Sequence, residues 1–207
     1  SHAIDQHRID AMRFRVAMFT NLSPDHLDYH GSMEAYFETK ARLFESSRCA
    51  FAVVNLDSPH GRLLADSADV PTDGYSIEEA HDLCLGVDGS SFEWSGQAVA
   101  LSIGGDFNVS NAIGAAHVAR ALGVDDATIA AGLSAPLVVD GRFERVDAGQ
   151  PFAIVVDYAH TPDGLERLLA AADDVVDGRV IVVFGCGGDR DRSKRPLMGR
   201  TAALHAD

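Results

Sequence analysis

Polar side chains that can do chemistry are concentrated in residues 21–30, directly after the apolar run Val16 to Phe19. That run predicts a buried strand, and loops at the carboxyl ends of strands in open α/β sheets are where ligands bind. Carboxylate and imidazole groups both bind metal ions, but the same residue types also suit a loop that caps helices through hydrogen bonds. The segment therefore predicts either metal or phosphate chemistry or a structural loop. Its candidate side chains are Asp25, His26, Asp28 and His30.

One lysine lies on the apolar face of a helix predicted from Ser32, its N-cap, to Glu45. Lys40 follows Tyr36 by four residues and precedes Phe44 by four, so it shares their face. Burial of an ammonium is costly and lowers a lysine pKa. A neutral amine can add carbon dioxide to form a carbamate, an anionic oxygen ligand suited to Mg²⁺. The alternative is that the stem covers the core while the ammonium reaches water, and the residues alone favour that alternative.

Two loops in the second half of the chain each follow an apolar strand and open a helix. Residues 185–195 combine three glycines with three arginines and a lysine, so backbone amides and guanidinium groups could hold a carboxylate or a phosphate. This loop lacks both G-x-G-x-x-G spacing and a G-K-[ST] phosphate loop, so it is not a nucleotide-binding fingerprint by itself. In residues 157–162, Thr161 fits the N-cap of the following helix. That leaves Asp157 and His160 as the functional candidates of the second loop.

The elements that must position these residues alternate between short apolar runs and amphipathic segments, which is typical of an α/β fold. Residues 83–103 alternate in hydrophobicity between turn signals, which predicts a small antiparallel set of strands. The last third predicts a parallel Rossmann-like unit. We expect a domain junction at residues 136–142, where the helical pattern lapses. The other predicted strands are residues 51–54, 153–156 and 180–184, and the other predicted helices are residues 60–66, 108–122, 125–134, 162–175 and 194–206.

The composition restricts the class of protein. The 207 residues carry 17 Lys and Arg against 31 Asp and Glu, a net charge of −14, which disfavours a general nucleic-acid binder. Three scattered cysteines without metal-ligand spacing predict a reduced, cytoplasmic compartment. No apolar run approaches the ~20 residues that span a bilayer, and no signal peptide opens the chain. The chain begins without Met and stops inside a predicted helix, so we expect a piece of a longer protein.

Seven motifs occur in one order along the chain: residues 19–23, 25–31, the helix that carries Lys40, and residues 107–111, 141–144, 157–162 and 185–191. Together they resemble the Mur ligase family. The strings D-Y-A-H-T-P and G-C-G-G-D-R-D are similar to those of the members that add the third residue of the peptidoglycan stem peptide. The resemblance covers nearly the whole chain and is weakest over residues 60–100.

The resemblance implies a fold and an activity. Residues 1–138 would form part of the central ATPase domain, including a small antiparallel β segment, and residues 139–207 the first part of a Rossmann-like C-terminal domain. The implied activity is ATP-dependent amide-bond formation, in which the D-glutamate side chain of UDP-N-acetylmuramoyl-L-alanyl-D-glutamate becomes an acyl phosphate. The amine of meso-diaminopimelate or L-lysine then attacks it. ATP and Mg²⁺ are the implied cofactors, and the UDP-linked dipeptide and a diamino acid the implied partners, with no nucleic acid and no membrane.

The resemblance also implies roles for single residues. His26 matches a Mg²⁺ ligand, and Lys40 matches the catalytic lysine that becomes carbamylated and bears on a second Mg²⁺, which reverses the preference for a solvated ammonium. Gln6 and Arg8 match residues that contact the UDP-linked dipeptide, and Arg190 the arginine that meets the carboxylate of the incoming amino acid. By position alone, Asn108 and Asn111 only begin a helix or offer amides to a base edge; the resemblance places them beside adenine. The remaining ATP-site matches are Arg142, Asp157 and His160.

Departures from the family pattern leave other functions open. The family's G-K-T phosphate loop, its uridine-binding domain and its D-N-P-R segment are not among these residues, so we expect the 207 residues alone to be inactive. Asp140 stands where the family usually has a small residue or proline. A folylpolyglutamate synthetase-like ligase shares the ATP chemistry and the modified lysine. A non-catalytic binding module and a metal-dependent hydrolase built on residues 25–30 are the alternatives from other classes.

Overall fold

A three-stranded parallel sheet organises the first half of the chain. The computed structural model describes residues 1–136, 139–176, 178–187 and 192–207. Strands β1 (Ala17–Phe19), β2 (Ala52–Asn55) and β3 (Thr72–Tyr75) lie side by side in that order, all parallel. Every residue of β2 is buried, as expected for a central strand covered on both faces.

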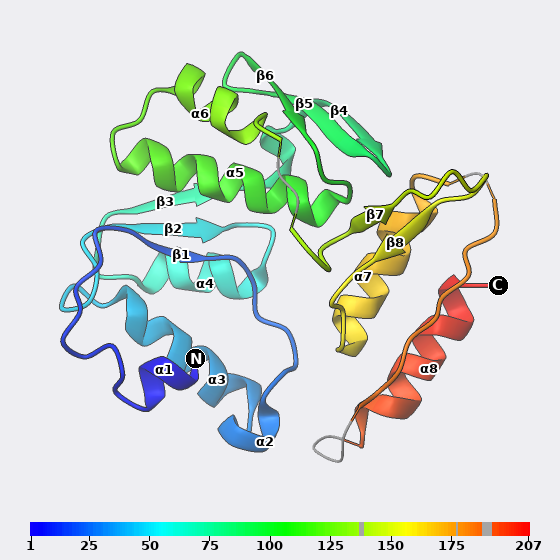
Figure 1. Cartoon of the computed structure of the whole chain (residues 1–207). Helices are drawn as coiled ribbons and strands as arrows, with labels where there is room; N and C mark the ends of the chain where they lie inside the picture. The colour runs from blue at the N-terminus through cyan, green and yellow to red at the C-terminus, as the bar shows by residue number, and fades with distance from the viewer. Residues whose placement is uncertain (137–138, 177, 188–191) are drawn as a thin grey trace.

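Helices cover both faces of the parallel sheet (Figure 1). Helix α5 (Asp106–Ala121) runs over one face, and α4 (Pro59–Ser67) lies against the other. The predicted N-cap of the lysine-bearing helix is confirmed, because the Ser32 hydroxyl accepts the Ala35 N–H at 3.2 Å. The other elements that precede β2 are α1 (His2–Asp5), α2 (Leu27–His30), α3 (Met33–Ala41) and a 3₁₀ turn, Arg42–Phe44.

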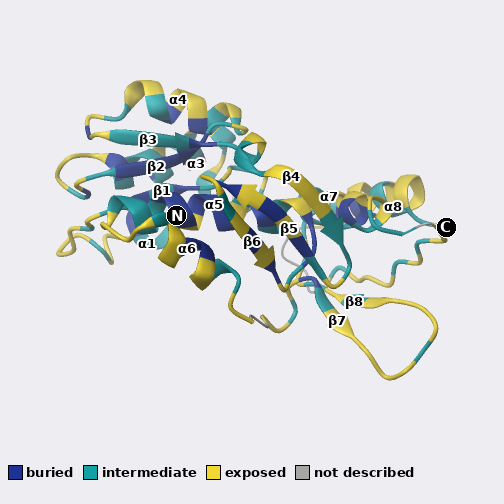
Figure 2. Ribbon diagram, turned by 90° about the horizontal axis from the view of Figure 1, so that it is seen from above, coloured by how far each residue is buried: buried dark blue, intermediate teal, exposed yellow. Residues whose placement is uncertain are grey.

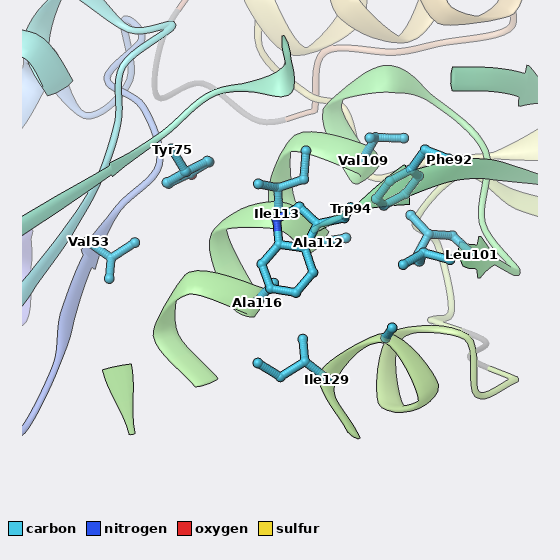
Figure 3. Packing of buried hydrophobic residues seen from close by; sticks show 12 residues of the cluster. Val53, Tyr75, Phe92, Trp94, Leu101, Val109, Ala112, Ile113, Ala116 and Ile129 are labelled. Atoms are coloured by element: carbon cyan, nitrogen blue, oxygen red, sulfur yellow. The ribbon is translucent and has the colours of Figure 1, made fainter. Parts of the chain in front are cut away.

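A hydrophobic core lies between α5 and a small antiparallel sheet (Figure 3). The sheet confirms the prediction for residues 83–103. Buried and exposed residues alternate along its middle strand, because one face packs against the helix and the other meets water. Trp94 and Ile113 are almost fully buried where the sheet meets α5. The elements are β4 (His81–Gly86), β5 (Gly89–Trp94), β6 (Gln97–Leu101) and α6 (Asp126–Leu133), which packs against β6 and α5.

A buried histidine ties the parallel sheet to α5. His117 is 5% exposed, and its Nδ1 and Nε2 atoms lie 2.7 Å and 2.8 Å from carboxylate oxygens of Asp73 and Glu79. Asp73 belongs to β3 and Glu79 to a 3₁₀ turn, Ile77–Glu79. The ring thus joins α5, β3 and the 3₁₀ turn through contacts at both of its nitrogens.

The last part of the chain forms a smaller unit beside the first. Strands β7 (Glu144–Val146) and β8 (Ile154–Val156) make an antiparallel pair, followed by α7 (Pro162–Asp173) and α8 (Lys194–His205). The two helices pack around Leu165, Leu169 and Met198. Figure 2 shows that the β7–β8 pair projects from the molecule and is largely exposed.

The α/β class is confirmed, but several elements differ from prediction. The strand predicted for residues 180–184 is wrong: β8 pairs with β7 instead, and the backbone of Val180 bonds to Asp207. The described part of this unit thus holds an antiparallel pair and no parallel one. Strands β3 and β7 and the short helix α2 were not predicted. Within the described residues, no helix has the length and apolar character needed to cross a bilayer.

Candidate functional site

A cavity of about 770 Å³ lies between the α5–α6 face of the first unit and the β8–α7 loop of the second. It is also bordered by the loops that leave β1 and β2, so the carboxyl ends of the parallel strands face it, where ligands of such sheets bind. All five residues predicted for the ATP site line this one cavity, although they come from three separate parts of the chain. They are Asn108, Asn111, Arg142, Asp157 and His160.

The two asparagines enter the cavity from the first turns of α5. This helix begins after Gly105, whose φ of +90° favours glycine. Asn108 donates from Nδ2 to the carbonyl of Gly104 at 2.7 Å, which fixes its amide and leaves Oδ1 as an acceptor. Asn111 lies three residues later on the same side of the helix and is exposed. Their amides suit the donor and acceptor edge of a nucleobase.

The second unit contributes a carboxylate, a guanidinium and two rings. Asp157 accepts the N–H of Phe143 at 2.8 Å and of Ala159 at 2.7 Å, so its carboxylate is held in place by backbone groups from both sides. The Arg142 guanidinium lies 5.1 Å from the Tyr158 ring, a cation–π contact that orients its planar fork. The His160 Nδ1 atom lies 2.9 Å from the Tyr158 carbonyl; when Nδ1 carries the proton, Nε2 is left as an acceptor.

Lys40 lies behind the β1 side of the cavity. Its ammonium is 5.1 Å from the Tyr36 ring and 5.9 Å from the Phe19 ring, and it donates to the Asn21 carbonyl at 3.4 Å. Burial lowers the pKa of the Lys40 amine, and the carboxylate of Asp25 partly opposes that shift. The side chain is half-buried among aromatic rings, and the carbonyl that accepts from it belongs to Asn21, which lines the cavity.

The two predicted metal-binding side chains, His26 and Lys40, lie near one carboxylate. His26 has a left-handed backbone with φ +55°, uncommon for a residue other than glycine. Its N–H donates to Asp25 at 2.9 Å, and its Nε2 lies 3.4 Å from the other oxygen of that carboxylate. Among the described residues, no three His, Cys, Asp or Glu side chains form a metal-binding group. Mg²⁺ is often held by one or two protein ligands plus phosphate oxygens and water, and this sparse donor set fits that pattern.

Two of the predicted substrate residues, Gln6 and Arg8, lie apart from the cavity. Gln6 and Arg8 are exposed just after α1, and neither lines it. Helix α1 is anchored to its neighbours by Asp5, which accepts from the Tyr29 hydroxyl at 2.7 Å and pairs with Arg42 at 3.5 Å. Arg190 lies outside the described residues.

Two cavity residues, Tyr158 and Thr20, were not predicted as site residues. Tyr158 was passed over as part of a motif, yet its exposed ring contacts both Arg142 and His160. Asp25 was predicted as a candidate metal-binding side chain, but its position near both His26 and Lys40 could not be read from spacing. Thr20 lines the cavity directly after β1; its place at the end of a predicted strand was the available signal.

Comparison with known families agrees with this geometry. The family described as Mur ligase middle domain matches residues 1–119, and the one described as Mur ligase, glutamate ligase domain matches residues 141–207. The chain belongs to the Mur ligase family. It is 46% identical over 218 residues to the UDP-N-acetylmuramoyl-L-alanyl-D-glutamate--2,6-diaminopimelate ligase of Gloeobacter violaceus, a match covering 100% of this chain and 44% of the relative. The chain thus spans less than half the length of that curated relative.

Solved structures place the fold in the same family. A UDP-N-acetylmuramoyl-L-alanyl-D-glutamate--2,6-diaminopimelate ligase superposes with a TM-score of 0.70 at 36% identity, covering 100% of this chain and 45% of the other. A folylpolyglutamate synthase from Mycobacterium tuberculosis gives a TM-score of 0.62 at 23% identity, covering 78% of this chain and 40% of the other. The second likeness is one of fold alone.

Proposed function

We propose that this chain is the part of an ATP-dependent amide ligase that holds ATP between a central and a C-terminal domain, divided near residue 138. The acceptor would be UDP-N-acetylmuramoyl-L-alanyl-D-glutamate and the added amino acid 2,6-diaminopimelate, because the relatives similar over the whole chain carry those names. The observation that carries the proposal is the single cavity lined by Asn108, Asn111, Arg142, Asp157 and His160.

Each side of the cavity supports a different part of the nucleotide. The amides of Asn108 and Asn111 suit an adenine edge. The fixed carboxylate of Asp157 can accept from ribose hydroxyls, and the oriented guanidinium of Arg142 can hold a phosphate through two parallel bonds. Because these groups come from both units, bound ATP would hold the units together and align the reacting groups, as amide ligation through an acyl phosphate requires.

The Lys40 environment supports carbamylation. An amine whose pKa is lowered by burial is neutral more often near neutral pH, and only the neutral amine adds carbon dioxide. The carbamate would turn a costly half-buried cation into an anionic oxygen ligand near His26 and Asp25. Mg²⁺ bound there would offset negative charge on the transferring phosphoryl group.

The substrate-side roles remain proposals of their own. Gln6 and Arg8, exposed after α1, would contact the UDP-linked dipeptide. Arg190 would bind the carboxylate of the incoming amino acid.

The experiment is a kinetic comparison in the full ligase that carries this chain, with product identified by mass spectrometry. Asn111→Ala should raise the KM for ATP by about tenfold, roughly 1.4 kcal/mol of lost binding, and leave the KM for the UDP-linked dipeptide unchanged. Gln6→Ala, also an amide-to-methyl change at an exposed site, should show the reverse pattern. Equal effects on both substrates, or a product made only with a folate acceptor, would contradict the proposal.

A further inference from the structure

One buried ring lies at the junction of the two units without lining the nucleotide cavity. Phe143 is 3% exposed and lines a second cavity of about 410 Å³, which Asp157 also borders. Its neighbour Arg142 is exposed and lines the nucleotide cavity. Arg142 and Phe143, consecutive in the chain, thus face two different cavities.

The Phe143 ring packs against the start of α5. It meets the Phe107 ring edge to face, with centroids 6.1 Å apart, and it lies so close to Gly104 that a Cβ there would come within 2.7 Å of the ring. Gly104 is the residue whose carbonyl accepts the Asn108 amide. The Phe143 ring therefore packs against the backbone whose carbonyl orients the Asn108 amide.

The backbone of the same residue is held by the second unit. The Phe143 N–H donates to Asp157 at 2.8 Å, and its φ is +44°, a left-handed conformation that is strained for a bulky residue. Strain of this kind persists only where the surroundings over-determine it. Here the surroundings are the packed ring on one side and the Asp157 carboxylate on the other.

We propose that Phe143 is a positioning residue that keeps the two halves of the nucleotide site in register. Its side chain packs against the first unit beside Gly104, and its backbone N–H donates to Asp157 of the second unit. Phe143 therefore contacts the groups that hold both Asn108 and Asp157 in place. The inference rests on the proposed nucleotide site and adds a residue that would not touch the nucleotide.

The test uses three variants of the full ligase that carries this chain. Phe143→Ala should raise the KM for ATP by about tenfold or more, roughly 1.4 kcal/mol, while the KM for the UDP-linked dipeptide stays constant. Phe143→Leu, which keeps an apolar side chain seated beside Gly104, should recover most of the affinity. Phe92→Ala is the matched control, because Phe92 is 4% exposed, lies on β5 in the core beside α5 and lines neither cavity.

The outcomes separate the possible failures. Phe143→Ala and Phe92→Ala should both lower the unfolding temperature, but only Phe143→Ala should raise the KM for ATP. The positioning role alone would be overturned if Phe143→Ala and Phe92→Ala raised the KM for ATP equally. It would also be overturned if Phe143→Ala left the KM for ATP unchanged while Asn111→Ala raised it. If neither Asn111→Ala nor Phe143→Ala changes the KM for ATP, the nucleotide site itself is refuted. Should Phe143→Ala fail to fold, Phe143→Val takes its place, because the shorter side chain no longer fills the position beside Gly104. A KM for ATP that stays at the wild-type value in Phe143→Val, together with a lowered unfolding temperature, would show a purely structural residue.

Discussion

The phenol of Tyr75 offers a quantitative test of the core between β3 and α5. Tyr75 is 1% exposed, and its hydroxyl has no hydrogen-bond partner among the described residues. Burial, assisted by the charge of Asp57, raises the pKa of Tyr75 from 10.0 to about 12. Because the unfolded chain loses this proton first as the pH rises, the native state loses stability between about pH 10 and pH 12.

Tyr75→Phe removes the titrating group and keeps the ring. Near neutral pH we expect a change of about 1 kcal/mol or less, in the stabilising direction, because an unpaired buried hydroxyl is removed. Above pH 10 the free energy of unfolding of the wild type should drop relative to that of the variant by roughly 1.4 kcal/mol for each pH unit, up to a difference of about 3 kcal/mol. Other groups that titrate in this range are common to both proteins and cancel.

The assay is urea unfolding from pH 8 to pH 11.5, followed by fluorescence and by far-ultraviolet circular dichroism. Trp94 is the single tryptophan and lies in the same buried cluster as Tyr75, so its emission reports the relevant core. Parallel stability curves for the two proteins across the whole range would refute the reasoning, because they would show that the native phenol reaches water.

Three further changes probe other parts of the chain. Lys40→Ala in the full ligase should remove most activity, with partial recovery by a small carboxylic acid and none by bicarbonate; full activity would restore the solvated-ammonium interpretation. His117→Ala should cost about 2–4 kcal/mol of unfolding free energy, measured in urea, because it removes a buried ring together with its contacts to Asp73 and Glu79. Thr161→Ala should cost about 1 kcal/mol, seen as faster amide exchange in the first turn of α7, because the Thr161 hydroxyl accepts the Gly164 N–H at 3.1 Å; unchanged exchange would show that the cap is not needed.

The elements with a clear period or cap were predictable, and those made by pairing were not. Ser32 and Thr161 marked helix starts, and both caps are present. Strand β3 was missed because Asp73 and Gly74 break any apolar run, yet its pairing with β2 makes it a strand. The opposite error occurred at residues 180–184, where apolar β-branched residues predict a strand but the backbone pairs with no strand in the described part of the chain.

The candidate site divides in the same way. Spacing along one helix placed Lys40 among aromatic rings, as the structure shows. No spacing could bring Asn108 to Asp157, since their proximity depends on how the two units meet; only the family resemblance joined them. Phe143 escaped prediction because its importance lies in what it contacts across the fold.

The small antiparallel sheet has a consequence for how the chain folds. Residues 76–105 separate β3 from α5, and a disordered connection of that length would raise the entropic cost of closure, by about 0.6 kcal/mol for each doubling. The three strands β4, β5 and β6 are instead neighbours in sequence joined by tight turns, and such hairpins form within roughly 1–10 μs. We expect this sheet to form early and shorten the effective loop. Helix α5 should then pack against β3 before the slower parallel pairing of β1, β2 and β3 is complete.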